Sequence, residues 1–217
     1  MDIEQVRTNM IEQQIRTWEV LDQDVLDLLF KVKREEFVPR QYSSLAFFDM
    51  EIPLGHGEQM WSPKLEARAL QELQLNKADK VLEVGTGSGY FTALLASQAA
   101  HVHSVDCIAE FVTDAGKKLA AHGFSNISLE TGDAARGWPA QGPYDAIVMT
   151  GSLPVLPDAL NKQMAPGGRL FVILGEAPVM KATLITCVAP NSFRSTVLFE
   201  TQIKALQNAL QPERFEF

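Results

Sequence analysis

The sequence predicts an α/β protein with a Rossmann-like, doubly wound sheet that is seven-stranded and mostly parallel, with a C-terminal antiparallel hairpin and an N-terminal helical layer. Short apolar segments alternate with amphipathic, helix-like segments through the middle of the chain, which is the pattern of βαβ units. Near the end, residues 181–188 and 194–201 are rich in β-branched residues and flank a turn at 189–193, which predicts the hairpin. Two amphipathic segments precede the first of these strands and predict the helical layer.

The helical layer is predicted from apolar residues at helical spacing. They indicate one helix over 5–18 and a second helix that begins at Asp22 or Asp24, acidic residues suited to a helix N-terminus, and extends to Val32. These helices belong to no βαβ repeat. We therefore expect them to pack over the sheet and to take part in substrate selection.

The segment that joins this layer to the sheet is rich in proline and glycine. Between residues 37 and 63 these residues predict an irregular, extended chain, after which Ser62 and Pro63 predict the N-cap and first position of a helix. Long ordered loops are usually functional. Further strands are predicted at 81–84, 102–105, 127–129, 144–149 and 169–174, with a helix over 108–122 that Gly123 ends.

Composition and charge narrow the classes of function. The chain has 217 residues, of which 46% are hydrophobic and 21% charged, as is ordinary for a globular protein. A formal charge of −8 and only short basic pairs disfavour nucleic acid as a partner. No apolar run is long enough to span a membrane, so we expect a cytoplasmic protein with no membrane partner. Cys107 and Cys187 are expected to be reduced, buried thiols, and the four histidines show no metal-ligand spacing, so no metal site is expected.

The most informative stretch is 81–92. An apolar strand candidate is followed by three glycines on alternate positions, Gly85, Gly87 and Gly89, and then by a helix candidate. Such a turn exposes backbone N–H groups at a helix N-terminus and favours a polar or charged cofactor. A dinucleotide fingerprint has its third glycine one residue later, which disfavours a nicotinamide-dependent oxidoreductase. The form Glu-x-Gly-x-Gly-x-Gly, starting at Glu83, instead resembles the first motif of the class I S-adenosylmethionine-dependent methyltransferases.

Two acidic residues follow later strand candidates. Asp106 ends the strand predicted at 102–105, where a carboxylate can accept hydrogen bonds from two ribose hydroxyls and can also cap the next helix. Asp133 follows the third strand candidate, where a carboxylate can accept from an adenine amino group. Both positions agree with an adenosyl cofactor.

Over nearly its full length the chain resembles the protein-L-isoaspartate O-methyltransferases. The resemblance is carried by Phe37-Val38-Pro39, Asp49, Pro53-Leu54-Gly55-His56-Gly57, the glycine motif, Gly132-Asp133, Tyr144-Asp145-Ala146-Ile147-Val148 and Pro166-Gly167-Gly168-Arg169-Leu170. It implies that S-adenosylmethionine is bound by Glu83, Gly85, Thr86, Gly87, Ser88 and Gly89, with Asp106 on the ribose and with Asp133 and Ala134 against the adenine. It also implies methyl transfer to the α-carboxyl group of isoaspartyl residues in damaged proteins, which starts their repair. We expect one methyltransferase domain over 1–217, with 1–63 as a helical and substrate-side segment and 64–217 as the cofactor-binding core.

One acceptor-side motif departs from the family pattern. After Gly-x-Gly the family usually has Gln-Thr-Ile-Ser, and its serine reaches the acceptor carboxylate. Aligned on Gly57 and Pro63, this chain has Trp61 in the serine's place, followed by Ser62. An indole is larger and offers one N–H donor and no hydroxyl, so Trp61 is expected either to form a pocket wall or to pack beneath the loop. Ser62 and Thr150 are the candidates to supply the missing hydroxyl.

The sequence therefore leaves the identity of the methyl acceptor undecided. The family's Arg-Phe-Val-Pro-Leu segment is also altered, to Gln202-Ile203-Lys204-Ala205-Leu206. Because a carboxylate is already ionised at neutral pH, its methylation needs no strong general base and tolerates the lost serine. The functions considered are isoaspartyl methylation, methylation of another small carboxylate or peptidic acceptor, and a catalytically silent relative that binds the cofactor or a protein partner. A nucleic-acid methyltransferase is disfavoured, because Met149-Thr150-Gly151-Ser152 lacks the Pro-Pro and Pro-Cys signatures expected there.

Overall fold

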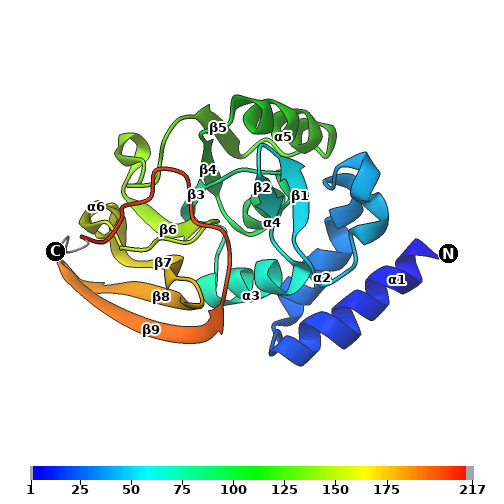
Figure 1. The fold of residues 1–217 in the computed structure, drawn as a ribbon, viewed down its shortest axis with the longest axis horizontal. Coiled ribbons are helices and arrows are strands. Elements are labelled where there is room, and N and C mark those ends of the chain that lie inside the picture. The colour runs from blue at the N-terminus through cyan, green and yellow to red at the C-terminus, as the bar shows by residue number, and fades with distance from the viewer. Residues whose placement is uncertain (1, 214–217) are drawn as a thin grey trace.

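The computed structural model describes residues 2–213 and has a seven-stranded sheet at its centre (Figure 1). The strand order is β5-β4-β3-β6-β7-β8-β9, and neighbouring strands from β5 to β7 are parallel. Each strand predicted in this part of the chain falls within an observed one, and the predicted fold class is confirmed. The parallel strands are β3 Lys80–Val84, β4 His101–Asp106, β5 Ile127–Thr131, β6 Tyr144–Met149 and β7 Met164–Glu176.

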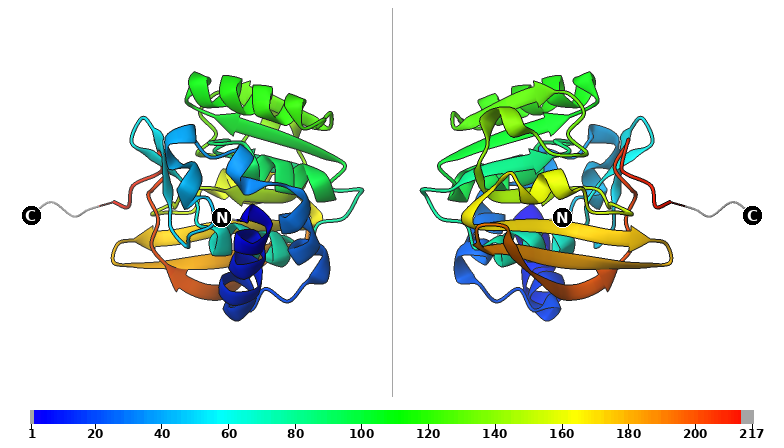
Figure 2. Two further views of the ribbon diagram at one scale, coloured as in Figure 1. Left: turned by 90° about the vertical axis from the view of Figure 1, so that its right-hand side faces the viewer. Right: turned by 90° about the vertical axis from the view of Figure 1, so that its left-hand side faces the viewer.

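The far edge of the sheet is antiparallel. β8 (Val179–Ala189) pairs with β7 on one side and with β9 (Ser192–Thr201) on the other. The predicted hairpin is therefore present as β8 and β9. A second antiparallel pairing joins it to the parallel strands, so β7, β8 and β9 run side by side in the lower half of the molecule in Figure 2, beside the N-terminal helices.

The chain winds to opposite faces of the sheet on the two sides of β3. The connections from β3 to β4 and from β4 to β5 place α4 and α5 in one core, together with α3 and with the N-terminal helices. The connection from β6 to β7 includes α6, whose Leu160 belongs to the core of the other face. Such a reversal leaves a crevice at the carboxyl ends of the two central strands. The helices are α3 Pro63–Leu73, α4 Tyr90–Gln98, α5 Ala109–Ala121 and α6 Asp158–Asn161.

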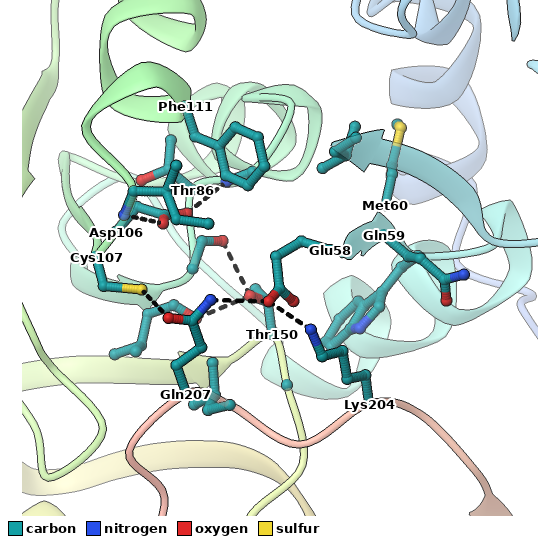
Figure 3. Close-up of a pocket in the computed structure, with 18 of the residues that line it drawn as sticks. Glu58, Gln59, Met60, Thr86, Asp106, Cys107, Phe111, Thr150, Lys204 and Gln207 are labelled. Carbon is teal, nitrogen blue, oxygen red and sulfur yellow. Dashed lines mark hydrogen bonds and ion pairs between the residues drawn. The ribbon is translucent and has the colours of Figure 1, made fainter. Parts of the chain in front are cut away.

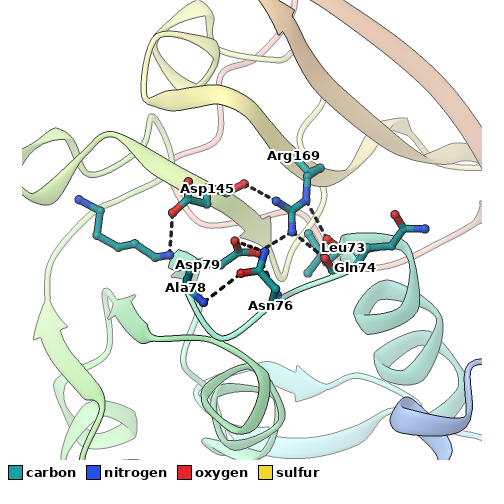
Figure 4. A network of polar contacts seen from close by, with 8 residues as sticks. Leu73, Gln74, Asn76, Ala78, Asp79, Asp145 and Arg169 are labelled. Atoms are coloured by element: carbon teal, nitrogen blue, oxygen red, sulfur yellow. Dashed lines mark hydrogen bonds and ion pairs between the residues drawn. The ribbon is translucent and has the colours of Figure 1, made fainter.

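A polar network closes the opposite, amino-terminal edge of these strands (Figure 4). Arg169 on β7 donates to the backbone carbonyl of Leu73 at 2.8 Å and to Asp79 Oδ2 at 2.7 Å. Asp145 on β6 accepts from the Lys80 backbone N–H at 2.8 Å. Because Asp79 is 5% exposed, these bonds satisfy buried charges and tie α3 to the sheet.

The N-terminal layer is one continuous helical run followed by a second helix. The predicted helix over 5–18 is present, but its middle widens into a π-helical turn and its end tightens into a 3₁₀ turn. Asp22 caps the second helix by accepting from the Asp24 and Val25 backbone N–H groups, as its side chain predicts. No helix among the described residues is long and apolar enough to cross a bilayer. The elements are α1 Ile3–Asn9, the π turn Met10–Ile15, the 3₁₀ turn Arg16–Trp18 and α2 Gln23–Lys31.

The segment predicted to be irregular contains a small hairpin, which corrects that expectation. β1 (Ile52–Gly55) pairs antiparallel with β2 (Glu58–Met60). The two connecting residues, His56 and Gly57, both have positive φ, at 53° and 74°. Positive φ at both positions is the geometry of the tight turns that match the twist of a hairpin. The His-Gly pair was therefore the feature of the sequence from which this hairpin could have been predicted. Short 3₁₀ turns lie at Arg34–Glu36, Arg40–Leu45 and Pro139–Gln141.

Candidate active site

A cavity opens at the carboxyl ends of β3, β4 and β6, where the winding reverses (Figure 3). Open α/β sheets bind their ligands at this place. The loops after these strands form one end of the cavity, and the β1–β2 hairpin and the chain after β9 form the other. Of the predicted cofactor-binding residues, the described lining includes Gly85, Thr86, Gly87, Ser88, Asp106, Asp133 and Ala134.

The glycine loop after β3 is shaped by positive φ values at each of its glycines. Gly85 has a φ of 100°, and a Cβ there would lie 2.0 Å from the Thr150 hydroxyl oxygen. Gly89 has a φ of 82° and forms the N-cap of α4. Glycine adopts this backbone at no steric cost, and its missing side chain lets the loop pack against β6. The loop therefore presents backbone to the cavity, as the sequence predicts.

Asp106 is held rigidly at the end of β4. Its Oδ2 accepts from the Gly87 backbone N–H at 3.0 Å, and its Oδ1 accepts from the Ile108 backbone N–H at 2.9 Å. The residue is 7% exposed, and burial raises the pKa of its carboxyl above the ordinary value although the backbone bonds oppose the rise. Each oxygen keeps further acceptor capacity toward the cavity it lines, which suits a pair of hydroxyl donors.

Glu83 lies behind the loop and outside the described lining of the cavity. It is fully buried on β3, and its Oε2 accepts from Thr92 Oγ1 at 2.5 Å and from Ser104 Oγ at 2.6 Å. Burial raises its pKa to about 8, against the hydroxyl bonds that lower it. Its Oε1 has no hydrogen-bond partner among the described residues. In this geometry Glu83 anchors the strand beneath the loop.

The adenine-side candidates line the same end of the cavity. Asp133 is exposed, and its Oδ1 accepts from the Ala135 backbone N–H at 3.0 Å, which fixes the carboxylate at the rim. Ala134 beside it is buried. The phenyl ring of Phe111 on α5 also lines the cavity, and the sequence reading missed it because one apolar residue on a helix is ordinarily a core residue.

Trp61 forms part of the wall at the other end. It is 6% exposed and packs against the rings of Phe91 and Phe171, with ring centroids 5.5 and 6.2 Å away. Its backbone carbonyl accepts from the Arg34 guanidinium at 2.5 Å. The indole N–H is buried and has no acceptor among the described residues. Trp61 thus both lines the cavity and packs in the core, so the two expected roles coincide.

The two hydroxyl candidates differ in position. Ser62 is the N-cap residue of α3, is 9% exposed and does not belong to the described lining of this cavity. Thr150 does line the cavity, but its hydroxyl donates to the backbone carbonyls of Val84 and Gly85 at 2.8 and 2.9 Å. A hydroxyl has one proton, so this donor is committed to the β3 backbone.

A cluster that the sequence reading missed spans the cavity at this end. Lys204 Nζ donates to Glu58 Oε1 at 2.6 Å and to the Gly57 carbonyl at 3.0 Å, and Gln207 Nε2 donates to the same Glu58 oxygen at 2.9 Å (Figure 3). Glu58 lies 146 positions before Lys204 and 149 before Gln207, so no local pattern links the hairpin to the chain after β9. Cys107 contacts Gln207 and is exposed, which corrects the expectation that both cysteines are buried; Cys187 is buried and both are free.

Arg34 and Glu66 form a second pair that the sequence did not reveal. Both are almost fully buried, and Arg34 Nε donates to Glu66 Oε2 at 2.9 Å. Burial raises the pKa of Glu66 to about 7, although the guanidinium opposes the rise. Arg34 belongs to a basic pair in the sequence, yet it supports the wall of the cavity instead of forming a charged surface.

No group of three or more potential metal ligands occurs among the residues 2–213 that the structure describes. His101 and His103 lie on either side of Val102 on β4, with ring centroids 4.7 Å apart, and His101 Nε2 hydrogen-bonds with Ser128 Oγ at 2.9 Å. Burial is the main cause that lowers the pKa of His103.

Comparisons with known proteins identify the family of the chain. The family model described as protein-L-isoaspartate(D-aspartate) O-methyltransferase matches residues 5–192. Protein-L-isoaspartate O-methyltransferase 1 of Rhodopseudomonas palustris is 41% identical over 169 residues, which are 78% of this chain and 69% of that protein. The enzyme of that name from Methanoculleus marisnigri is 39% identical over 78% of this chain and 77% of its own.

Solved structures show the same fold. A protein-L-isoaspartate O-methyltransferase structure matches with a TM-score of 0.80 at 23% identity, over 93% of this chain and 66% of that one. A Plasmodium falciparum structure described as this methyltransferase in complex with S-adenosyl-L-homocysteine matches with a TM-score of 0.78 at 19% identity, over 94% of this chain and 97% of its own. The predicted family is confirmed: this chain belongs to the protein-L-isoaspartate O-methyltransferase family.

Proposed function

We propose that this protein transfers a methyl group from S-adenosylmethionine to a carboxylate oxygen of an isoaspartyl peptide or of a closely related small carboxylate. One observation carries the proposal. A single cavity joins the glycine loop and Asp106 at one end to Trp61 and Lys204 at the other. Such a cavity can hold two molecules in contact, and methyl transfer requires this contact. Family membership selects this function over that of a catalytically silent relative.

The residues at the first end suit S-adenosylmethionine. Asp106 has free acceptor capacity for two ribose hydroxyls, and the glycine loop offers backbone without side chains. Asp133 and Ala134 would face the adenine, while Thr86 and Ser88 complete the loop. Gly89 shapes the turn and Glu83 supports it from behind. When bound, the cofactor supplies an electrophilic methyl group on a sulfonium sulfur.

The protein's part in the reaction is alignment and exclusion of water. An ionised carboxylate is already a nucleophile near neutral pH, so no side chain has to remove a proton from it. Holding an acceptor oxygen in line with the methyl group accounts for much of the rate gain in such transfers. The rings of Trp61 and Phe91 give the acceptor end an apolar wall that keeps water out.

Trp61 affects which methyl acceptor the protein can bind. Trp61 and Thr150 are the two acceptor-side candidates that line the cavity, and the Thr150 donor is committed to the backbone. An indole in place of the family serine narrows the pocket and removes a hydroxyl donor. We infer that fewer kinds of carboxylate-bearing molecule fit the acceptor pocket of this protein than fit the pockets of its relatives.

Two measurements test the proposal. S-adenosylhomocysteine should raise the thermal midpoint of the purified protein and give a calorimetric binding signal. The native protein should methylate an isoaspartyl peptide and leave the matching aspartyl peptide unmodified. Absence of S-adenosylhomocysteine binding would contradict the cofactor assignment, whatever the peptide assay gives.

The variant Trp61→Ser tests which acceptor the site recognises, and Trp61→Phe is the control that keeps an aromatic ring. Removing the indole should cost about 3–5 kcal/mol of folding free energy, so both variants are assayed below their unfolding transitions. We expect Trp61→Ser to change the KM for the peptide more than the Kd for S-adenosylhomocysteine. Activity on the isoaspartyl peptide that appears only in Trp61→Ser would show that the native acceptor is a different carboxylate.

The division of the chain into a substrate-side segment, 1–63, and a cofactor-binding core, 64–217, also remains a proposal. It is supported by the β1–β2 hairpin, which brings Glu58 and the following Trp61 to the cavity from the first segment. The cytoplasmic location expected from the sequence is likewise proposed, and cell fractionation tests it.

A further inference from the structure

We propose that Lys204 and Gln207 form the carboxylate-binding subsite for the acceptor, and that the Glu58 carboxylate is an internal competitor for it. The inference rests on the proposed function and names the residues that select the acceptor. It explains how the site can bind a carboxylate without the hydroxyl that Trp61 replaces.

The geometry of the subsite is visible because a carboxylate already lies in it. Glu58 Oε1 accepts from Lys204 Nζ at 2.6 Å and from Gln207 Nε2 at 2.9 Å (Figure 3). An ammonium and an amide that converge on one carboxylate oxygen are a suitable donor pair for any carboxylate of similar reach. Lys204 and Gln207 both line the cavity, and so does Glu58.

Because the cavity is acidic, an acceptor carboxylate needs the positive charge of Lys204 in order to bind there. Five carboxylates belong to its described lining: Glu51, Glu58, Glu66, Asp106 and Asp133. Lys204 is the one lysine or arginine in that described lining. An acceptor carboxylate that enters this acidic surrounding is repelled unless it reaches the ammonium group. The pair with Glu58 is also easy to exchange, since the side chain of Lys204 is 48% exposed and half-exposed ion pairs are weak.

The other donors at this end do not compete for the role. The Thr150 hydroxyl donates to the backbone of β3 and the loop, and Ser62 lies outside the described lining. The indole N–H of Trp61 has no described acceptor but is buried, so it can act only as a supplementary donor after a local shift. Lys204 and Gln207 come from the chain after β9, whereas the cofactor-side residues come from the loops after β3, β4 and β5. Gln207 also reaches the loop after β4, where it accepts from Cys107 Sγ at 3.5 Å, whereas Lys204 contacts Gly57 and Glu58 of the hairpin. The position of Lys204 therefore assigns the subsite to the acceptor and not to the carboxylate of the cofactor's methionine.

Binding titrations with the full chain test the assignment. The probe is an isoaspartyl peptide, added to protein saturated with S-adenosylhomocysteine, so the readout does not depend on turnover. Lys204→Met should weaken peptide binding about 10- to 100-fold, as loss of a charge-assisted hydrogen bond does. Lys204→Arg should recover part of that loss. Glu58→Gln should strengthen peptide binding severalfold, because a neutral amide competes less well for the ammonium.

The controls separate this inference from the proposed function. Lys117→Met, at an exposed lysine on α5, should change neither affinity. In the double variant Glu58→Gln/Lys204→Met, the gain from Glu58→Gln should vanish, because its competitor role needs the lysine. The Kd of S-adenosylhomocysteine should stay within about threefold in every variant.

Each contrary outcome has a distinct meaning. If Lys204→Met weakens the binding of S-adenosylhomocysteine more than the binding of the peptide, the subsite serves the cofactor's carboxylate and the proposal is overturned. An unchanged peptide affinity in Lys204→Met, or failure of the native protein to bind the peptide while it binds S-adenosylhomocysteine, overturns it as well. Loss of S-adenosylhomocysteine binding in the native protein would instead overturn the proposed function.

Discussion

The two ends of the cavity are built in different ways. At the end that we propose for the cofactor, called the cofactor end, the wall consists of backbone groups and one buried carboxylate: Gly85 and Gly87 shape the loop, and Asp106 is fixed by two backbone N–H groups. At the acceptor end, long side chains from the β1–β2 hairpin and from the chain after β9 meet across the cavity. The first arrangement is rigid because strands on both sides hold it, whereas the second depends on half-exposed side chains.

This difference shows which part of the molecule can change without loss of the fold. Each glycine of the loop has a positive φ, so an added side chain would strain the backbone, and at Gly85 it would also collide with Thr150 after β6. The loop therefore tolerates little variation. At the acceptor end, Glu58 is held by Lys204 and Gln207, and partly exposed contacts of this kind contribute little to stability. The acceptor end can therefore be altered, as Trp61 illustrates, while the cofactor end is kept.

The largest effect should come from Gly85→Ala, compared with Gly55→Ala at the acceptor end. The two glycines have nearly equal φ, 100° and 98°, so both variants carry a backbone strain of about 1–2 kcal/mol. A Cβ at Gly85 would also lie 2.0 Å from the Thr150 hydroxyl, whereas a Cβ at Gly55 meets nothing within 4 Å. We expect Gly85→Ala to lower the free energy of unfolding, measured in urea, by several kcal/mol. Its affinity for S-adenosylhomocysteine should fall by more than about 100-fold. Equal losses in the two variants would contradict the contrast between the ends.

Asp106→Asn should have an intermediate effect that is confined to the cofactor. An amide offers one acceptor oxygen where the carboxylate offers two, and one of its groups would face a backbone N–H as a donor. S-adenosylhomocysteine binding measured by calorimetry should weaken about 10- to 100-fold, while peptide recognition should change little. Asp114→Asn on the exposed face of α5 is the matched control and should leave the Kd unchanged. An unaffected Kd in Asp106→Asn would remove this residue from the ribose-binding role.

The smallest effect concerns pH and tests whether Glu83 is a buried anchor. Burial raises its folded-state pKa to about 8, so between roughly pH 5 and 8 the unfolded chain has released a proton that the folded chain keeps. Unfolded protein then binds fewer protons than folded protein, and the stability of the native chain falls as pH rises through this window. Glu83→Gln removes the titrating group and should flatten the slope by on the order of 1 kcal/mol per pH unit within the window.

Urea unfolding of the native protein and Glu83→Gln at several pH values measures this slope. The amide oxygen of glutamine can still accept from Thr92 and Ser104, so the variant keeps the hydroxyl bonds that hold the anchor. Parallel slopes in the two proteins would show that Glu83 keeps its ordinary titration in the fold.

By itself the sequence determined the fold class, the family and most of the cofactor end. Those features depend on local order: glycine spacing sets backbone φ over a few residues, and the candidate binding residues lie at the ends of strands or in the loops directly after them, as with Asp106 at the end of β4. Tertiary structure alone decided that Glu83 lies behind the cavity and that Arg34 is buried against Glu66. It also brought Glu58 to Lys204 and Gln207 from the other end of the chain. Such meetings depend on how distant segments cross, and burial and charge pairing then set the properties of each group, so no local pattern encodes them.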